Sequence, residues 1–524
     1  MLINRRLLAA LLVIGILTIT GGLYRLWPSV MVNTPSTPHL AIGIIGNSRQ
    51  LESLCPDGST IRSRYLPLSA VYEGPVRYDA TRGIRPVLLK EWRVAPDGRS
   101  VDLIFKKHIR FHNGKEMTAQ DIKDCWERTL QRAASGEVVG LYTPIAGVDE
   151  FLRGQAKEIY GLQVISSNAI KVRFMNPQAF FISSLAHPGF WVYDSMDKTT
   201  WAPGTGPFTL KDIKNDLIIV DAYNHYHGDK AQISGIDFQI FTDGAQAIQA
   251  YREGKLNLVD EVEPAELKEL IKDDNIARQI IRQPVMAVYG VALNMDKEPW
   301  RDNYLLRRAL NYGIDRQALV SEIFAGGALA CSGPLPCNLK LGKAGERGYN
   351  YNPELAKQLL AEAGYANGDG LSAITLYYLS DSGYRELAAS VAEQLGTLGV
   401  EVYPRPLNED SMLSELDSHR FESCLLGWQA DYPEVYALFN TIYNHGITGY
   451  QNPKVAQLLT GIGGQPNNKQ QEALIKIYKT ITDDAPMLWL CQPQTVKLAQ
   501  PIVSGLELNG LNQIDWGRVG FRSR

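Results

Sequence analysis

The alternation of strand and helix signals in the second half of the chain is the feature that most constrains its fold. Leu376 to Leu379 has the character of a short strand, Tyr384 to Leu395 of a helix, and Val400 to Tyr403 of a second strand. Alternation of this kind builds a parallel sheet covered by helices, which is the α/β class. A further apolar run, Cys424 to Leu426, extends the pattern and precedes a helix-like segment from Val435 to Tyr443.

Between that last strand and helix lies the segment from Gly427 to Glu434, with the sequence GWQADYPE. It places one carboxylate, Asp431, between two aromatic residues, Trp428 and Tyr432, at a strand-to-helix turn. A rigid backbone beneath the carboxylate and aromatic walls beside it suit the capture of a small cationic group in a partly dry cleft. The alternative is structural: both aromatic side chains belong to the core, and Asp431 caps the following helix.

Several other segments carry equally direct signals. Ser100 to Phe105 alternates polar and apolar residues, as a half-buried strand does. Thr118 and Asp121 have the spacing of a capping box at the start of a helix. We expect strands at Leu40 to Ile45 and at Pro486 to Gln492. The first predicted helix has an apolar face, and two further helices are expected to start at polar N-terminal residues. The face comprises Ile122, Cys125, Trp126 and Leu130, and the two helix starts are Asp315 and Asn352.

Length and charge limit the class of protein. With 524 residues the chain is too long for one ordinary core, so two to three domains are expected. The formal net charge of −3 leaves no basic surplus for a phosphate backbone, which disfavours a nucleic-acid-binding protein.

The chain lacks the familiar motifs of catalysis and metal binding. None of its six cysteines forms a Cys-x-x-Cys pair, and no histidine lies at zinc-ligand spacing from them. Nothing in the sequence assembles a nucleophile, a base and an orienting group, so we expect no catalytic residue, metal or cofactor. Cys331 and Cys337 flank the sequence SGPLP. They either close a small loop as a disulfide in an oxidising compartment or remain two unpaired small side chains.

The N-terminus has the sequence pattern of an export signal. Arg5 and Arg6 precede an uncharged, mostly apolar run from Leu7 to Tyr24, which directs translocation of the residues that follow. The run is about 18 residues long, just enough to span a bilayer. Residues 1–27 are therefore either a cleaved signal or an uncleaved membrane anchor, and residues 28–39 form a Pro-rich, Thr-rich and Ser-rich tether. Either way the rest of the chain is expected outside the cytoplasm.

Several motifs occur in the order found in one family of proteins. The most recognisable is Phe111 to Gly114 followed by Thr118, Ala119 and Asp121. The others are Tyr72 to Tyr78, Trp92 with Pro96-Asp97-Gly98, Gly204 to Phe208, Asn224 to Tyr226, Gly254-Lys255, Asn294, Arg307 with Ala309-Leu310, Asp315-Arg316, and Gly427 to Tyr432. From about Leu40 to its end, the chain resembles the peptide/nickel family, family 5, of extracytoplasmic solute-binding proteins of ABC importers.

The resemblance implies a two-lobed α/β fold, the type II, cluster C-like periplasmic-binding-protein fold with an extra inserted domain. Lobe I would consist of residues 40–65, 204–290 and 494–524, the inserted domain of 66–203, and lobe II of 291–493. Such a protein closes about a hinge when its ligand touches both lobes, because only then does the ligand bind the closed state better than the open state.

The resemblance also implies roles for four residues. Asp431 matches the family's carboxylate for the ligand α-amino group, and Trp428 and Tyr432 would line the pocket. Arg385 matches the position that meets the ligand carboxylate in dipeptide receptors, and its alternative is a solvated helix face. Departures from the family pattern leave the ligand class open. They are Val435 in place of Pro, Asn257 in place of Asp, and His108 in place of Gly.

The leading functional hypothesis is a monomeric periplasmic receptor that hands short peptides to an ABC permease in the inner membrane, without chemistry of its own. A second hypothesis keeps the fold but changes the ligand to a metal chelate, haem, an opine or an oligosaccharide. A third is a membrane-tethered sensor. An exported hydrolase has no motif behind it. The sequence alone does not give the length or identity of the ligand.

Overall fold

The structure, a computed structural model, describes residues 38–46, 62–133, 136–197, 201–339, 341, 348–380, 383–444 and 446–522. The expected export segment at residues 1–27 lies outside these ranges, as does the tether up to residue 37. Within the described ranges, no helix combines the length and the apolar character needed to cross a bilayer.

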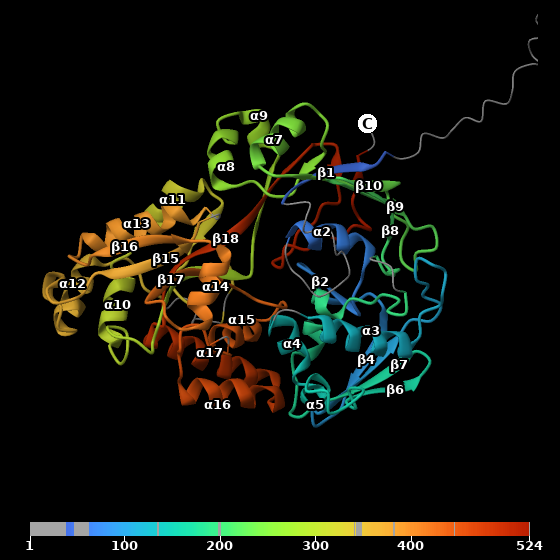
Figure 1. The fold of residues 1–524 in the computed structure, drawn as a ribbon, viewed down its shortest axis with the longest axis horizontal. Coiled ribbons are helices and arrows are strands. Elements are labelled where there is room, and N and C mark those ends of the chain that lie inside the picture. The colour runs from blue at the N-terminus through green and yellow to red at the C-terminus, as the bar shows by residue number, and fades with distance from the viewer. Residues whose placement is uncertain are drawn as a thin grey trace, which may run out of the picture.

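One mixed sheet runs through both halves of the molecule (Figure 1). In spatial order its strands are β16 (Val402–Leu407), β15 (Ile374–Leu379), β17 (Ser423–Gln429), β13 (Ala287–Leu293), β18 (Met487–Ala499), β11 (Leu258–Val259), β1 (Leu40–Ile45), β10 (Gly235–Phe241), β9 (Leu217–Ala222) and β8 (Phe208–Lys214), with β12 (Ile280–Pro284) and β14 (Ala328–Ala330) also paired to β18. Strand β15 pairs in parallel with β16 and β17, as the alternation of strands and helices predicts.

In the half that contains β13 to β17, helices enclose the sheet on both sides (Figure 1). One layer packs around Trp300, Leu310 and Leu425, and the other packs around Phe439 and Trp489. The first layer comprises α10 (Tyr304–Tyr312), α11 (Arg316–Phe324), α12 (Pro353–Glu362) and α13 (Tyr384–Gly396); the second comprises α14 (Glu409–Asp417), α15 (Val435–Asn444), α16 (Pro453–Gly461), η5 (Ile462–Gly464) and α17 (Asn467–Asp484). This half corresponds to the expected lobe II.

The other half joins the far end of the large sheet to a smaller antiparallel sheet. Leu40 and Phe238 of the large sheet share one apolar cluster with Phe105 and Trp126 of the smaller unit. The smaller unit contains β4 (Leu89–Val94), β5 (Ser100–Phe105), β7 (Ala169–Arg173), β6 (Leu162–Ser166), α3 (Ala119–Arg132), α4 (Gly136–Tyr142), α5 (Val148–Leu152), α6 (Phe181–Ser184) and η2 (Pro188–Phe190). It lies within residues 66–203, the range expected for the inserted domain. The boundaries of the three predicted domains stay a prediction.

The remaining elements lie around lobe I. Three helices at the top of Figure 1 cover β11 and β1 and pack around Ala247, Leu267 and Leu270. They are α7 (Gly244–Arg252), α8 (Pro264–Leu270) and α9 (Asp274–Ala277); the other elements are α2 (Arg62–Val71), β2 (Val76–Asp79), β3 (Gly83–Pro86), β19 (Val503–Ser504) and β20 (Gly520–Phe521).

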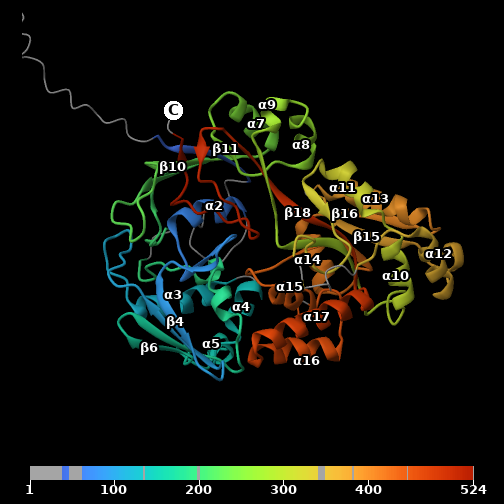
Figure 2. The same ribbon diagram turned by 180° about the vertical axis from the view of Figure 1, so that it is seen from behind.

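Strand β18 belongs to both halves and passes between them (Figure 2). Its first part pairs with β13 and its second part with β12 and β11. At the crossing the buried Gln492 amide donates to the Val285 carbonyl at 2.8 Å and to Asn338 Oδ1 at 2.7 Å. The sequence predicts that this strand ends at Gln492, but it continues to Ala499. It continues because the Pro493 carbonyl still accepts from the Val285 amide at 3.0 Å.

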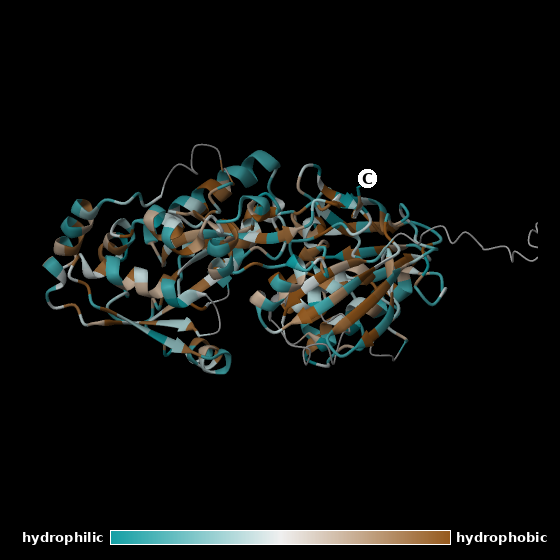
Figure 3. Cartoon of the chain, turned by 90° about the horizontal axis from the view of Figure 1, so that it is seen from above, coloured by the Kyte–Doolittle hydropathy of each residue, from teal (hydrophilic) through white to brown (hydrophobic). Residues whose placement is uncertain are grey.

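Local signals in the sequence explain many of these elements. Thr118 and Asp121 form the predicted capping box of α3, each side chain bonding the other residue's backbone amide. Strand β5 buries Val101, Leu103 and Phe105 and leaves the residues between them half-buried, as the alternation predicts. Figure 3 shows the same principle across the molecule, with apolar residues concentrated in the strands and polar residues on the outer helices.

Candidate functional site

The predicted site lies at the carboxyl end of β17, a strand between β13 and β15 in lobe II. Its last paired residues are Trp428, opposite Val288, and Gln429, opposite Ala287. The Ala430 amide then donates to the Met286 carbonyl at 2.8 Å, so the backbone is held up to the residue before Asp431. The chain reaches α15 four residues later. This is the strand-to-helix turn that the sequence predicts.

The structure places the three residues of this turn at different depths. Trp428 is 4% exposed and packs in the lobe II core, in the cluster that holds Phe439 and Trp489. Asp431 and Tyr432 are half-buried in the turn itself. Burial raises the pKa of the Tyr432 phenol above its usual range, and the neighbouring Tyr436, Asp431 and Glu434 add to the shift. The phenol therefore stays protonated and keeps a hydroxyl group that can donate.

Tyr432 also touches both halves of the molecule. It packs against the apolar cluster of lobe I and the inserted domain, and against the lobe II cluster around Phe439. The turn that carries Asp431 therefore lies at the interface between the two halves. A residue in this place can respond to their closure.

Arg385 lies apart from this turn, exposed in the first helical turn of α13. Its neighbour Tyr384 packs edge to face against Tyr289, with 5.5 Å between ring centroids. Tyr289 pairs across the sheet with Gly427, so the start of α13 and the end of β17 lie at the same end of the sheet. Trp428, Asp431 and Tyr432 thus share one turn at different depths, and Arg385 lies on a separate helix at the same end of the sheet. The ligand roles of these four residues stay a prediction.

Lobe I contributes a carboxylate that no sequence motif indicated. Glu263 precedes α8, and its Oε2 lies 3.8 Å from the point that a Cβ at Gly383 would occupy, at the start of α13. Burial raises the pKa of Glu263 to about 7, and the nearby carboxylates of Glu261 and Glu266 add to this shift. Only the fold brings Glu263 from one lobe to a helix of the other, so no local sequence signal could have identified it.

No described group of three or more His, Cys, Asp or Glu side chains is arranged to hold a metal ion. Cys331 is buried, Cys337 is exposed, and both are free thiols, so the loop-closing disulfide is not formed in this structure. Instead, the Cys331 thiol donates to the Leu335 carbonyl at 3.1 Å and the Cys337 thiol to Gln492 Oε1 at 3.1 Å.

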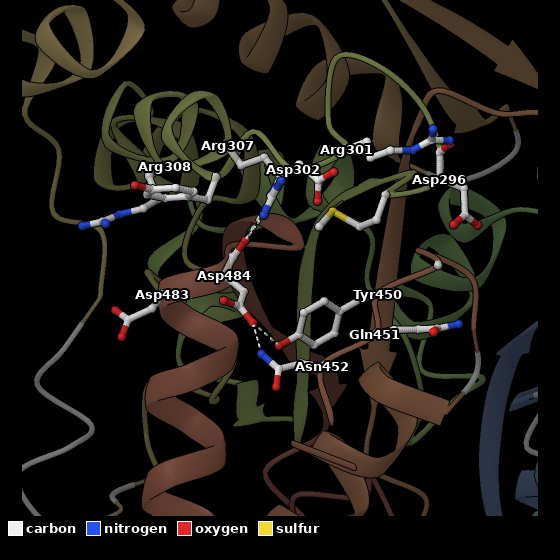
Figure 4. Close-up of a pocket in the computed structure, with 13 residues that line it drawn as sticks. Asp296, Arg301, Asp302, Arg307, Arg308, Tyr450, Gln451, Asn452, Asp483 and Asp484 are labelled. Carbon is white, nitrogen blue, oxygen red and sulfur yellow. Dashed lines mark hydrogen bonds between the residues drawn. The ribbon is translucent and has the colours of Figure 1, made fainter. Parts of the chain in front are cut away.

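A separate polar recess of about 900 Å³ lies on lobe II between α10 and the end of α17 (Figure 4). Its most buried cation, Arg307, already donates to the carbonyls of Asp484 and Trp300. Asp484 in turn accepts hydrogen bonds at 2.6 Å from the Tyr450 hydroxyl and at 2.7 Å from the Asn452 amide. These contacts join the end of α17 to α10. None of the four predicted site residues lines the recess.

Solved structures with the same fold are two-lobed periplasmic binding proteins. The Escherichia coli murein tripeptide binding protein MppA matches with a TM-score of 0.76 and 19% identity, over 93% of this chain and 99% of that one. The periplasmic binding protein DppA from Helicobacter pylori, solved in complex with the peptide STSA, matches with a TM-score of 0.75 and 19% identity. That match covers 92% of this chain and 98% of DppA. The fold is therefore that of the two-lobed periplasmic binding proteins.

Sequence comparison gives the family. The profile of the bacterial extracellular solute-binding proteins, family 5 (middle region), matches residues 83–450. Similar relatives include heme-binding protein A of Haemophilus influenzae, 25% identical over 80% of this chain and 81% of its own. The periplasmic oligopeptide-binding protein OppA of Escherichia coli is 24% identical over 83% of this chain and 84% of its own. The protein belongs to family 5 of the bacterial extracellular solute-binding proteins, the receptors of ABC importers, as its motifs predict.

Proposed function

We propose that this protein captures short peptides outside the cytoplasm and delivers them to an ABC permease of the inner membrane. The observation that carries the proposal is the position of Asp431. It follows a firmly paired strand, is half-buried, and belongs to the turn whose Tyr432 packs against both halves of the molecule. The relatives named as oligopeptide-binding proteins support the peptide as ligand.

The chemistry required of Asp431 is the binding of an ammonium group. A carboxylate in a partly desolvated site forms a strong, charge-assisted hydrogen bond to such a group, provided that other contacts complete its coordination. A peptide held in this way by lobe II and touched by lobe I binds the closed state more tightly than the open state, and so favours closure. Arg385, at the start of α13, would meet the other end of a short ligand.

Native mass spectrometry of protein purified from the exported fraction tests this proposal. We expect the wild type to carry a mixed set of peptide-sized adducts, and Asp431→Ala to lose them, because loss of the charged contact costs about 1.5–3 kcal/mol, or roughly 10–100-fold in affinity. Asp417→Ala is the matched control, since it removes an exposed carboxylate elsewhere in lobe II. Equal adducts on Asp431→Ala and Asp417→Ala would contradict the role of Asp431.

A second candidate ligand is haem, favoured by the similarity to heme-binding protein A. A haem receptor of this fold would have no need of an ammonium contact. Titration with haem, followed by its absorbance, would then saturate at one equivalent in both the wild type and Asp431→Ala. If the ligand is a peptide, added haem should not displace the bound peptides.

The proposal also includes a monomeric receptor, tethered to the inner membrane or released by cleavage after residues 7–24. Fractionation of cells that express the full chain distinguishes these two forms. An uncleaved protein in the membrane fraction, together with unchanged peptide uptake when its gene is deleted, would favour a sensor over a transport receptor.

A further inference from the structure

The two halves of the molecule touch at a second place, away from the hinge strand β18. Here the inserted domain contributes the segment from Pro177 to Ser184, and lobe II contributes residues around the start of α15 and η5. The Ser183 hydroxyl donates to Glu434 Oε1 at 2.6 Å, across 251 positions of sequence. A bond between residues so far apart in sequence exists only while the two halves are together.

An aromatic pair lies beside this hydrogen bond. The rings of Phe180 and Tyr436 stack with 4.7 Å between centroids and 19° between planes. Each partner is anchored in its own half. Phe181, next to Phe180, packs against Phe174 inside the inserted domain, with 4.8 Å between ring centroids. Tyr436 packs against the lobe II cluster around Phe439. Stacked pairs of this kind add to the gain from burying their apolar surface.

The backbones of the two halves also meet directly. A Cβ built at Gly463 would lie 2.0 Å from the Pro177 carbonyl oxygen, a distance that no real side chain tolerates. A Cβ built at Gly464 would lie 3.5 Å from a carbon of the Pro177 ring, which is an ordinary van der Waals contact. A glycine at position 463 is therefore what allows lobe II to approach the inserted domain this closely.

Several ionisable groups face Glu434 in this interface. Burial raises the pKa of the Glu434 carboxyl above its usual range, and the hydrogen bond from Ser183 opposes the rise. Neighbouring groups come from β2 of the inserted domain and from the turn of Glu434 itself. Tyr78 and Tyr432 lie near Glu434 itself, Asp79 lies near Tyr78, and Asp431 and Tyr436 lie near Tyr432.

We infer that these three contacts form a latch, by which the inserted domain holds lobe II in the arrangement described here, termed closed, against an open arrangement in which the two halves have moved apart. The latch comprises the Ser183–Glu434 hydrogen bond, the Phe180–Tyr436 stack and the Pro177–Gly463 backbone contact. The inference goes beyond the proposed function, because it concerns how the two halves hold together and does not depend on which ligand binds. Glu434 lies three residues after Asp431, so the latch also positions the turn that carries the predicted site.

The latch has a consequence for binding. A receptor that is partly closed when empty has already met some of the free-energy cost of closure, which raises its apparent affinity. A ligand must nevertheless wait for the latch to open before it can enter and leave. Loss of the latch should therefore speed both association and dissociation.

The experiment measures distances between spin labels in the ligand-free protein by pulsed electron resonance. Labels replace Lys157 of the inserted domain and Lys454 of α16, both exposed, in a Cys55→Ser and Cys337→Ser background, which removes the one exposed thiol of the described residues and the one cysteine outside them. Gly463→Ala adds the Cβ that collides with Pro177. Gly461→Ala is the matched control, because nothing lies within 4 Å of the Cβ that it adds.

We expect the ligand-free parent and Gly461→Ala to show a short distance, and Gly463→Ala to lower the closed-to-open ratio by roughly tenfold or more. Phe180→Ala combined with Ser183→Ala should act in the same direction, whereas Met196→Ala, which truncates a side chain that is 71% exposed, should not. A long distance in the empty parent, or equal distances in Gly463→Ala and Gly461→Ala, would overturn the inference. Matching circular dichroism spectra and melting temperatures establish that the variants fold, and binding through Asp431 is tested separately.

Discussion

Gly427 stands one residue before Trp428, and the ring of Tyr289 fills the space beside it. A Cβ at position 427 would lie 2.4 Å from a carbon of that ring. The absence of a side chain therefore lets Tyr289 cover the end of β17, and Tyr384 then packs against Tyr289. One small residue thus shapes the wall that links the strand of Asp431 to the helix of Arg385.

Gly427→Ala should destabilise the protein. The added methyl group overpacks a well-filled contact, which typically costs about 1–3 kcal/mol. Urea unfolding measures the loss. Gly140→Ala serves as the control, since no atom lies within 4 Å of the Cβ it adds, and its stability should be unchanged or slightly higher. Equal midpoints for the two variants would show that Tyr289 moves aside without cost.

A buried ion pair provides a second test at the residue scale. Lys497 on β18 is 0% exposed, and its ammonium donates to both the carboxylate and the carbonyl of Asp260. Lys497→Met should cost about 3–5 kcal/mol of unfolding free energy, because it leaves a carboxylate buried without its cation. Lys497→Met combined with Asp260→Leu should recover much of that loss. A double variant that is no more stable than the single one would contradict this account of the pair.

Single residues were predictable where their role is local. The capping box of Thr118 and Asp121 depends on residues three apart, and the sequence shows it directly. The turn that carries Asp431 was predictable for the same reason. Glu263 and Ser183 gave no such signal, because the groups they approach lie far away in the sequence.

At the scale of secondary-structure elements, the contact between α6 and the start of α15 should respond to pH. Burial in the closed state raises the pKa of Glu434, so the closed state binds a proton more tightly than the open state, where this carboxyl is exposed to water. As pH falls from above the raised pKa to below the usual carboxyl range, the closed fraction should therefore increase. Above both pKa values the full cost of burying the charge opposes closure.

The spin-label distance, followed across this pH interval, measures the effect. Glu434→Gln is the conservative control: it keeps an oxygen that accepts from Ser183 but cannot titrate, so its closed fraction should lose that part of the pH dependence. An identical pH profile for the wild type and Glu434→Gln would assign the titration to another group.

Elements with strong local patterns agree closely with their prediction. Asp315 and Asn352 cap α11 and α12, and β1 and β5 have the predicted bounds. The error at the end of β18 has a clear cause. Pro493 resembles a strand breaker, since it has no amide hydrogen to donate, but the pairing of β18 with strands of both lobes carries the strand past it.

At the scale of the whole molecule, the alternation of strands and helices predicted the α/β class, and the ordered motifs predicted the two-lobed fold. Neither of these sequence patterns predicts the spatial order of the strands in the sheet. Strand β18 inserts between β13 and β11, which precede it by about two hundred residues, and this pairing depends on contacts that no local pattern encodes. The second contact between the lobes, at Pro177 and Gly463, escaped prediction for the same reason.

The continuity of β18 has a consequence for how the protein comes apart. This strand forms ladder hydrogen bonds with β13 in one lobe and with β12 in the other. If one lobe unfolds, the other lobe therefore loses a paired strand of its own sheet. The lobes should thus lose their structure together, and scanning calorimetry should record one heat-absorption peak. Two resolved peaks would mean that the two lobes unfold independently of each other. A receptor built in this way bends at its hinge and melts as a single unit.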